Sequence, residues 1–330
     1  MASSSGPHVL VAGGAGYIGS HTAKELRRAG MVPVVLDNLV TGNRFALRYG
    51  PFHEGSIADV SLVGRIVAEY RIESAILFAG HAYVGESTVH PRKYFSNNVS
   101  GSLGFLEALL DTGVRKLVFS SSCSIYGGSS QSPNNENCPM DPLSPYAETK
   151  LFLEKVLRWY DSAYAFRSVC LRYFNASGAD PEGELGELHD PETHLIPLAI
   201  YAALGGTPLQ IFGSDYPTPD GTAIRDYVHV SDLAAAHVLA LKKLLTGSPS
   251  DRINLGSGAG SSALEVVRMV ERVSGRSVPL QLGPRREGDA SVLIADAAKA
   301  HRILAWTPRY STLECIVGTA WRWHIKDRPV

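Results

Sequence analysis

Short apolar runs alternate with amphipathic segments over about the first 175 residues. The runs predict β-strands at His8–Ala12, Val34–Leu36, Ser74–Phe78, Lys116–Ser120 and Ser168–Leu171. The amphipathic segments between them predict helices that bury one face. Alternation of this kind is typical of a parallel sheet covered by helices on both faces. The pattern therefore predicts an α/β fold with a doubly wound parallel sheet.

The pattern changes after about residue 176. Proline, glycine and acidic residues cluster in Ala179–Pro191, and later apolar runs such as Leu209–Phe212 and Arg252–Leu255 are short. A chain of 330 residues is long enough for about two domains. We expect residues 1–175 to form the sheet domain, with later segments crossing back onto it. Residues 176–330 are expected to form a smaller mixed α/β domain, with the substrate cleft between the two.

Glycines follow the first predicted strand at the spacing G-x-x-G-x-x-G. They are Gly13, Gly16 and Gly19, and a helical segment follows over Ser20–Gly30. Such a turn lets backbone N–H groups approach a pyrophosphate at the positive end of a helix dipole. The second predicted strand ends in Asp37, 24 residues after Gly13, where the dinucleotide fingerprint places an acid against the ribose hydroxyls. A glycine turn alone often has no ligand, but the two signals together predict a Rossmann fold. They also predict NAD rather than NADP, whose additional phosphate Asp37 would repel.

Composition excludes several classes of function. The net charge of −1 and the pI near 6.8 give no field that favours nucleic acid or an anionic membrane. The longest apolar segment, Leu195–Leu204, has ten residues, far fewer than the roughly 20 that span a bilayer. The N-terminal residues do not form a secretory signal. The four cysteines lack C-x-x-C spacing, which favours a reduced cytoplasmic setting without a metal or redox pair.

Tyr146 and Lys150 form a second chemical signal. If Ser144 and Pro145 open a helix, the two side chains stand at i and i+4 on one face. A cation about 4 Å from a phenol, at an effective dielectric constant near 20, favours phenolate by up to about 4 kcal/mol, or about three pKa units. A surface Tyr/Lys pair is the commoner case. Together with the glycine turn and the strand-end residue Ser122, the pair predicts a catalytic base.

These residues resemble the extended short-chain dehydrogenase/reductase family. The glycine turn, Ser122 and the Tyr146/Lys150 pair carry the resemblance. Within this family the chain is similar to the UDP-glucose 4-epimerases over nearly its whole length. The matching blocks are Gly13–His21, Val84–Ser87, Leu171–Asn175, Asp220–Thr222, Arg225–Val230 and Arg285–Asp289. The late blocks are the most specific, because they belong to members that act on sugar nucleotides.

The resemblance implies that UDP-glucose and UDP-galactose are interconverted by transient oxidation at C4 of the sugar. Tyr146 takes the proton of the 4-hydroxyl while hydride passes to NAD, and Ser122 hydrogen-bonds the same oxygen. Lys150 holds the nicotinamide ribose and lowers the pKa of Tyr146. The 4-keto sugar then turns over and takes the hydride back on its other face. Such chemistry requires a tightly fixed nucleotide diphosphate and a loosely held sugar.

The resemblance also implies two sets of binding residues. Arg225 and Arg286 would bind the diphosphate, because guanidinium donors bind phosphate in a bidentate manner. Phe212 would pack on the uracil, and Asn175 and Asp289 would hydrogen-bond the substrate. The cofactor set is Gly13, Gly16, Tyr17, Ile18, Gly19, Asp37, Asn38, Ser56, Ile57, Phe78, Ala79, Gly80, Asn98, Ser120, Tyr146, Lys150 and Tyr173. The substrate set is Ser122, Tyr146, Asn175, His194, Leu195, Gln210, Phe212, Arg225, Tyr227, Arg286, Asp289 and Leu293.

Some positions depart from the family pattern. Ser56 stands where the family carries an acid near adenine, which weakens one adenine contact. Ala82 replaces a lysine of many epimerases, and the segment Ala82–Ser87 also occurs in members acting on pentose nucleotides. Leu293, four residues after Asp289, is at the position that gates sugar size. Its intermediate volume predicts UDP-glucose and UDP-galactose as the main pair, with weak turnover of N-acetylhexosamines.

Other interpretations require residues that differ from those present. Sugar-nucleotide dehydratases carry Asp-Glu after the strand-end serine, and decarboxylases carry an acid nearby, whereas this chain has Cys123, Ser124 and Ile125. A non-enzymatic NAD-binding regulator commonly loses the tyrosine or the lysine. A UDP-xylose/UDP-arabinose 4-epimerase stays open, and so does a dehydrogenase that releases NADH.

The remaining expectations concern metal binding by histidines and the oligomeric state. None of the 11 histidines has H-E-x-x-H or comparable spacing, so no metal ligand is predicted. His194 either approaches the diphosphate or has a structural role. The resemblance implies a homodimer that forms through helices such as Pro91–Asp111 and Ser144–Ser162.

Overall fold

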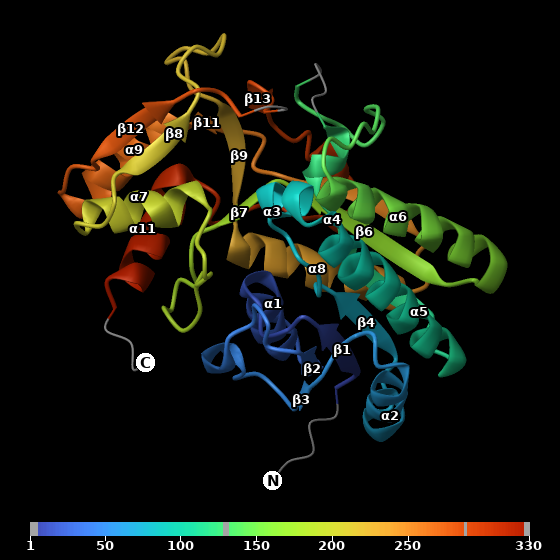
Figure 1. The fold of residues 1–330 in the computed structure, drawn as a ribbon. Helices are drawn as coiled ribbons and strands as arrows, with labels where there is room; N and C mark the ends of the chain where they lie inside the picture. Colours follow the sequence, from blue (N-terminus) through green and yellow to red (C-terminus); the bar gives the residue numbers. More distant parts are fainter. Residues whose placement is uncertain (1–5, 128–131, 287–288, 327–330) are drawn as a thin grey trace.

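A parallel sheet forms the centre of the molecule (Figure 1). The computed structural model describes residues 6–127, 132–286 and 289–326. Within these ranges the sheet has seven strands in the order β10-β6-β5-β4-β1-β2-β3, all parallel. They are β1 (His8–Ala12), β2 (Val32–Asp37), β3 (Phe52–Glu54), β4 (Ser74–Leu77), β5 (Lys116–Ser120), β6 (Arg167–Tyr173) and β10 (Asp251–Leu255). The predicted doubly wound parallel sheet is confirmed.

The sequence of β1 shows why the sheet is buried on both faces. Leu10 and Ala12 belong to one hydrophobic cluster, and Val9 and Val11 belong to another. Successive side chains of a strand point to opposite faces. All four are fully buried, so the strand is apolar throughout, as a sheet with helices on both sides requires.

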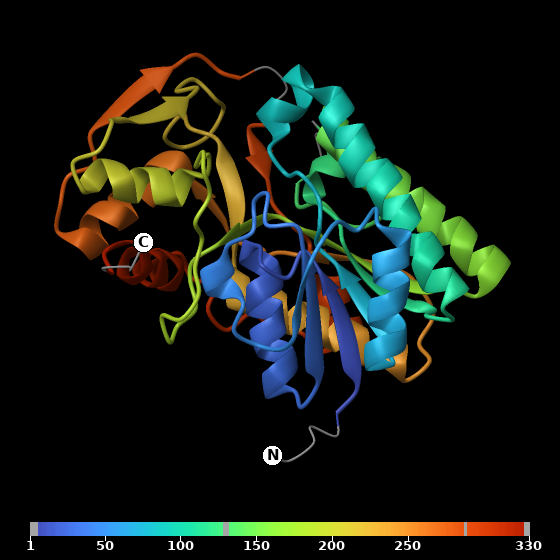
Figure 2. The same cartoon turned by 60° about the horizontal axis from the view of Figure 1, so that its bottom comes forward.

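Two groups of helices cover the sheet (Figure 2). One face carries α1 (Tyr17–Arg28), α8 (Val230–Leu245) and α10 (Ala298–Leu304), and the other carries α2 (Val60–Tyr70), α5 (Ser102–Asp111) and α6 (Pro145–Tyr164). Ser144 caps α6 by accepting a hydrogen bond from the backbone N–H of Ala147 at 3.2 Å. A serine cap followed by proline at the first helical position is a favourable start. The helix therefore begins where the sequence predicts it.

The predicted helix over Pro91–Asp111 has an irregular middle. It consists of α4 (Pro91–Tyr94), the π-helical segment η2 (Phe95–Gly101) and α5. Such widened turns are uncommon and are frequent at functional sites. The remaining short helices are η1 (Arg44–Ala46), α3 (Val84–Val89) and η3 (Cys123–Tyr126).

The second part of the chain packs around its own core. It contains a sheet of β11 (Gly260–Ser262), β9 (Ile224–His229) and β13 (Val292–Leu293), with β7 (Asn175–Ser177) also paired to β9. A separate parallel pair joins β8 (Leu209–Phe212) to β12 (Leu280–Gly283). Helices α7 (Leu195–Ala203), α9 (Ala263–Ser274) and α11 (Leu313–His324) surround this core.

The chain passes between the two parts more than once. It leaves the central sheet after β6, yet α8 returns to pack on α1 and β10 pairs with β6 at the sheet edge. The longest apolar segment of the sequence is α7, whose Ile196, Ala199 and Ile200 are buried in the second core. Across the described ranges, no helix has both the length and the apolar character needed to cross a bilayer.

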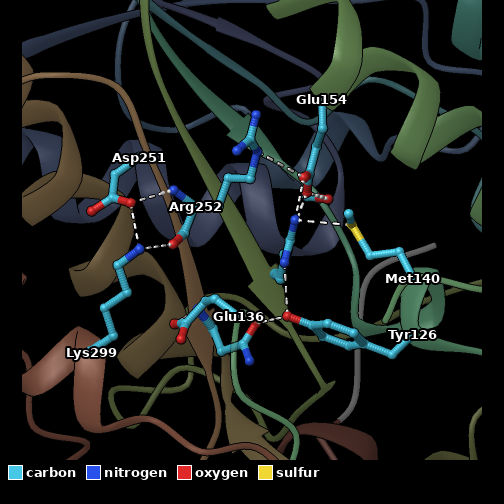
Figure 3. A network of polar contacts seen from close by, with 10 residues as sticks. Tyr126, Glu136, Met140, Glu154, Asp251, Arg252 and Lys299 are labelled. Atoms are coloured by element: carbon cyan, nitrogen blue, oxygen red, sulfur yellow. Dashed lines mark hydrogen bonds and ion pairs between the residues drawn. The ribbon is translucent and has the colours of Figure 1, made fainter. Parts of the chain in front are cut away.

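A buried ion pair joins β6 to α6. Arg172 donates from Nε to Glu154 Oε1 at 2.9 Å and from Nη2 to Oε2 at 2.6 Å, and both side chains are almost fully buried. Ser121 Oγ donates to Glu154 Oε1 at 2.6 Å. Arg172 also donates to the Tyr126 hydroxyl at 2.9 Å, and Tyr126 donates to Asn254 at 2.7 Å. Figure 3 shows Glu154 and Tyr126 at opposite ends of this network. Through Ser121, this network anchors the backbone directly before Ser122.

We expect Glu154→Gln to lower the free energy of unfolding by about 3 kcal/mol, because it leaves a buried guanidinium without its counter-charge. Urea unfolding of the full chain measures the loss. Glu148→Gln is the matched control, since Glu148 lies exposed on the same helix and should change stability by less than about 0.5 kcal/mol. Equal stability of the two variants would contradict the role assigned to the pair.

Candidate active site

The glycine turn lies where the strand order reverses. The chain proceeds from β1 outward to β2 and β3 on one side and to β4, β5 and β6 on the other. In open α/β sheets, ligands bind at this switch point, outside the carboxyl ends of the strands. Gly13 has φ +83°, and a Cβ there would lie 2.5 Å from the backbone nitrogen of Ala79. A Cβ at Gly19 would lie 2.2 Å from the Gly13 carbonyl oxygen. Only glycine fits either position.

The cradle formed by this turn fits a dinucleotide. Helix α1 begins after Gly16 without a side-chain cap, so the N-terminal N–H groups of the helix are available to a pyrophosphate. Asp37, at the end of β2, accepts hydrogen bonds from Ala15 N at 2.9 Å and Leu39 N at 2.8 Å. Burial raises the pKa of Asp37, and these backbone hydrogen bonds oppose the shift. The carboxylate is therefore fixed beside the glycine turn.

Ser122, Tyr146 and Lys150 meet at the carboxyl end of β5. All three side chains are more than nine-tenths buried, and Ser122 hydrogen-bonds Tyr146. Lys150 Nζ donates to the Ser120 carbonyl oxygen at 2.7 Å. The hydroxyls of Ser120 and Tyr173 lie 2.6 Å apart. The structure thus brings together the residues predicted to be catalytic.

Burial dominates the electrostatics of this group. It raises the pKa of Tyr146, an effect that the Ser122 hydrogen bond opposes. It lowers the pKa of Lys150 to about 8. Lys150 Nζ lies 5.8 Å from the centroid of the Tyr146 ring and 5.0 Å from that of Phe119. The sequence predicted that the Lys150 ammonium lowers the pKa of Tyr146. Without a bound cofactor, burial has the larger effect on this pKa, so Tyr146 is a neutral phenol.

Asn98 fixes the loop after β4. Its Oδ1 accepts a hydrogen bond from His81 N at 2.8 Å, and its Nδ2 donates to His81 O at 2.9 Å. The same amide donates to Thr149 Oγ1 of α6 at 3.3 Å. A Cβ on Gly80 would lie 3.3 Å from Asn98 Oδ1. The irregular turn of η2 therefore places an amide that holds the His81 backbone, directly after the Phe78–Gly80 segment.

Other members of the predicted cofactor set have local structural contacts. Tyr17 donates to the Gly178 carbonyl oxygen at 2.6 Å and links α1 to the loop after β7. Ser56 Oγ accepts from Ala58 N at 3.1 Å, and Asn38 Oδ1 accepts from Val40 N at 3.2 Å. Ile57 is buried in the core formed with α2 and α5, so its side chain contributes to packing.

Phe212, Arg225, Arg286 and Asp289 gather in the second part of the chain. The Arg286 guanidinium lies 4.9 Å from the centroid of the half-exposed Phe212 ring, and its Nε donates to Asp289 Oδ2 at 2.9 Å. Arg225 Nη2 lies 3.4 Å from Asp289 Oδ1. The two guanidinium groups share one carboxylate and retain positive charge for an anionic ligand. Glu287 and Gly288 of the same motif lie outside the described residues.

This cationic group adjoins the catalytic one. Arg225 is the register partner of Leu293 across β9 and β13. Leu293 packs against the hydrophobic cluster that contains Cys123. Asn175 donates to the Asp226 carbonyl oxygen at 3.2 Å, and its register partner across β7 and β9 is the buried Tyr227.

Three further residues predicted to bind substrate lie on α7 and β8. Gln210 is exposed on the same face of β8 as Phe212. Leu195 is the first residue of α7, and His194 precedes it. His194 Nδ1 lies 2.8 Å from Glu187 Oε1 and 2.9 Å from Glu192 Oε1. Burial lowers the pKa of His194, but these carboxylates outweigh it and raise the value to about 10.

The carboxylates around His194 were missed by the sequence analysis. Glu187, His189, Glu192 and His194 lie within one loop, and their side chains converge. Their signal is the spacing E-x-H-x-x-E-x-H, which matches no helical or strand period. The sequence analysis considered His189 and His194 only as isolated histidines.

Comparisons with known proteins agree with this geometry. Residues 9–256 match the NAD dependent epimerase/dehydratase family. A UDP-glucose 4-epimerase of Lacticaseibacillus casei is 48% identical over 318 residues, which cover 96% of each chain. The chain belongs to the NAD-dependent epimerase/dehydratase family. NAD is accordingly its cofactor, which the glycine cradle and Asp37 accommodate.

Solved structures of epimerases share the fold. The UDP-glucose 4-epimerase of Brucella ovis in complex with NAD superimposes with a TM-score of 0.94 at 50% identity, covering 96% of this chain and 98% of that one. The UDP-glucose 4-epimerase of Bifidobacterium longum in complex with NAD+ and UDP gives a TM-score of 0.91 at 36% identity, with 96% and 98% covered. The family assignment therefore extends over nearly the whole chain.

We expect Asp37→Ser to weaken NAD binding by about 10- to 100-fold, because a hydrogen bond to a charged group contributes roughly 1.5–3 kcal/mol. Discrimination against NADP should fall in the same variant. Fluorescence titration of the cofactor-free chain measures both. Glu54→Gln is the control, since Glu54 is the exposed register partner of Asp37 on β3. An unchanged NAD affinity in Asp37→Ser would exclude the proposed ribose contact.

Proposed function

We propose that this chain is an isomerase that interconverts UDP-glucose and UDP-galactose with NAD as a resident cofactor. The observation that carries the proposal is the meeting of Ser122, Tyr146 and Lys150 at the sheet edge beside the glycine cradle. Arg225 and Arg286 lie on the second part of the chain, and the register partner of Arg225, Leu293, packs against the cluster that contains Cys123. A reacting sugar between the two groups would have its hydroxyl near a phenol and its diphosphate near guanidinium donors.

Each residue of the proposed site has a separate role in the reaction. NAD, when bound, supplies the hydride acceptor for C4 of the sugar. Tyr146 accepts the proton of the 4-hydroxyl at its Oη and returns it after the sugar has turned. Ser122 holds the same oxygen through its hydroxyl, and Lys150, anchored on the Ser120 carbonyl, stabilises the phenolate. Arg225 and Arg286 hold the diphosphate so that the sugar turns without leaving.

Each part of the chain is proposed to bind a different ligand. We propose that residues 1–175, with the segments that cross back, bind NAD, and that residues 176–330 bind the UDP-sugar. Supporting observations are the position of the glycine turn at the end of β1 and of the arginine group around β9. The relatives support glucose and galactose over xylose and arabinose, since they are UDP-glucose 4-epimerases.

A homodimer in the cytoplasm is the proposed setting. Exposed aromatic side chains lie on the helices predicted to pair, with Phe95 at 45%, Phe152 at 44% and Trp159 at 64% exposure. Phe152 and Trp159 are seven residues apart on α6 and so share one face of that helix, and apolar side chains grouped on an exposed face support an interaction site. Cys123, Cys170 and Cys315 have free thiols, which suits a reducing compartment.

Replacing Tyr146 by Phe should lower kcat at least about 100-fold, because it removes the group that moves the proton. NAD should remain bound. The matched control is Tyr164→Phe, at the exposed end of the same helix, which should keep full activity. Interconversion of UDP-galactose and UDP-glucose is followed by chromatography, and cofactor content by absorbance after denaturation. Near-normal turnover in Tyr146→Phe would exclude the mechanism.

Product analysis without added NAD should rank the substrates. UDP-galactose should give UDP-glucose at the highest kcat/KM. UDP-N-acetylglucosamine should react more slowly because Leu293 narrows the space for larger substituents, and UDP-xylose should react more slowly because it lacks the hydroxymethyl group and the contacts of that group. Comparable kcat/KM for UDP-N-acetylglucosamine and UDP-glucose would refute the role of Leu293. Release of NADH in proportion to product would identify a dehydrogenase instead.

A further inference from the structure

The loop before α7 concentrates metal-ligating atoms. Glu187, His189, Glu192 and His194 each offer one oxygen or nitrogen, and these atoms all lie within 4.8 Å of one another. The side chains of Glu187 and Glu192 are only 4% and 5% exposed. The cluster therefore places two carboxylates and two imidazoles around one partly buried point.

Two of these atoms have no hydrogen-bond partner among the described residues. His189 Nδ1 and Glu192 Oε2 are buried without a hydrogen bond of acceptable geometry, whereas Glu187 Oε1 lies 2.8 Å from His194 Nδ1. Yet His189 Nδ1 lies 3.2 Å from Glu187 Oε1 and 3.7 Å from Glu192 Oε2. Unpaired polar atoms in native interiors are uncommon and require an explanation. His189 Nδ1 thus faces two carboxylate oxygens without a hydrogen bond to either, which is how ligands lie around a common centre.

A neighbouring acidic cluster is neutralised by a lysine of the chain itself. Asp180, Glu182 and Glu184 surround Lys24, whose Nζ lies 2.7, 2.8 and 2.6 Å from their oxygens. The ammonium occupies the place a cation would take. Among the residues that the structure describes, no lysine or arginine forms an ion pair with Glu187 or Glu192. A cation at that cluster must therefore come from outside the chain or from protons on the imidazoles.

We propose that Glu187, His189, Glu192 and His194 bind one divalent transition-metal ion of the zinc class. Imidazole nitrogen with carboxylate oxygen is a donor set that zinc accepts in tetrahedral sites, with bonds of about 2.0–2.2 Å. Such bonds separate the ligand atoms by about 3.4 Å. His189 Nδ1 lies 3.2 and 3.7 Å from the carboxylate oxygens, and His194 Nδ1, at 2.8 and 2.9 Å, would move outward by about half an ångström on binding the ion. Mg²⁺ and Ca²⁺ prefer oxygen ligands alone.

Outer contacts orient the ligands as metal sites require. Glu192 Oε1 accepts from Thr193 N at 2.7 Å and His194 N at 2.8 Å, which leaves Oε2 to face His189. The Trp323 indole donates to the Glu187 carbonyl oxygen at 2.9 Å. The loop backbone is thus held on both sides of the ligands.

The position of the site suggests what the ion does. The His189 ring lies edge-on to Tyr17 at 6.2 Å, and Asn43 donates to the Leu188 carbonyl oxygen at 3.1 Å. His194 and the adjacent Leu195 both belong to the predicted substrate set. The ion fixes the loop between the start of α1 and the start of α7. This role is independent of the proposed reaction, since binding requires no UDP-sugar.

Zinc titration of the full chain tests the site. The protein is stripped with a chelator and titrated with Zn²⁺ against a chromophoric chelator, without UDP-sugar. We expect one Zn²⁺ per chain, not displaced by equimolar Mg²⁺. His189→Gln should weaken binding at least about 100-fold, since even outer-contact losses cost 10- to 100-fold. The controls are Glu182→Gln in the Lys24 cluster and His301→Gln on the surface, both with unchanged affinity.

Hydrogen exchange supplies a second measurement that needs no variant. Zn²⁺ should slow amide exchange in peptides spanning residues 187–195 and leave the Lys24 cluster loop, residues 180–184, unchanged. Equal zinc affinity in His189→Gln and the native chain, or less than one site in the native chain, would overturn the proposal. Amide exchange in residues 187–195 that does not change when zinc is added would also overturn the proposal.

Discussion

The close contact between the turn after β1 and the start of the loop after β4 determines the rest of the architecture. No side chain fits between Gly13 and Ala79, where a Cβ would come within 2.5 Å of backbone. Because the two loops touch, the N-terminus of α1 opens onto the same edge as the end of β5. A dinucleotide bound along that edge has its phosphates at one strand and its reactive ring near another. The position of the catalytic group is thus a consequence of backbone packing.

Burial has opposite consequences for the two catalytic side chains. It favours the neutral form of both, so the pKa of Tyr146 rises and that of Lys150 falls to about 8. Without a further positive charge, the site keeps its proton on the phenol. If Tyr146 is the base, as proposed, its reactivity would therefore require the oxidised cofactor in addition to the polypeptide. Such dependence limits unproductive proton transfer when the cleft lacks its cofactor.

The sequence predicted the regular, locally encoded elements best. β1 and β5 have the predicted bounds because each apolar run ends at glycine or serine, and α6 begins at its Ser144 cap. The strands β7, β9 and β13 were not predicted, since they are short and take their pairing from one another. The pairing of Arg172 with Glu154, 18 residues apart, depends on how α6 packs against β6, and the convergence of Glu187 with His189 depends on loop geometry. The assigned ligand contacts rest on the family resemblance and stay predictions.

The repeated passage of the chain between its two parts makes them inseparable. The face of the sheet that carries Val9, Val11 and Val118 is covered by α8 and α10, which come from beyond residue 229. A fragment ending at β6 would leave that apolar face in water and would lack its edge strand β10. The substrate-binding segments are therefore excursions from a sheet that closes only when the whole polypeptide has been made. New specificities in such an architecture arise by changing the excursions, because the sheet cannot be exchanged without them.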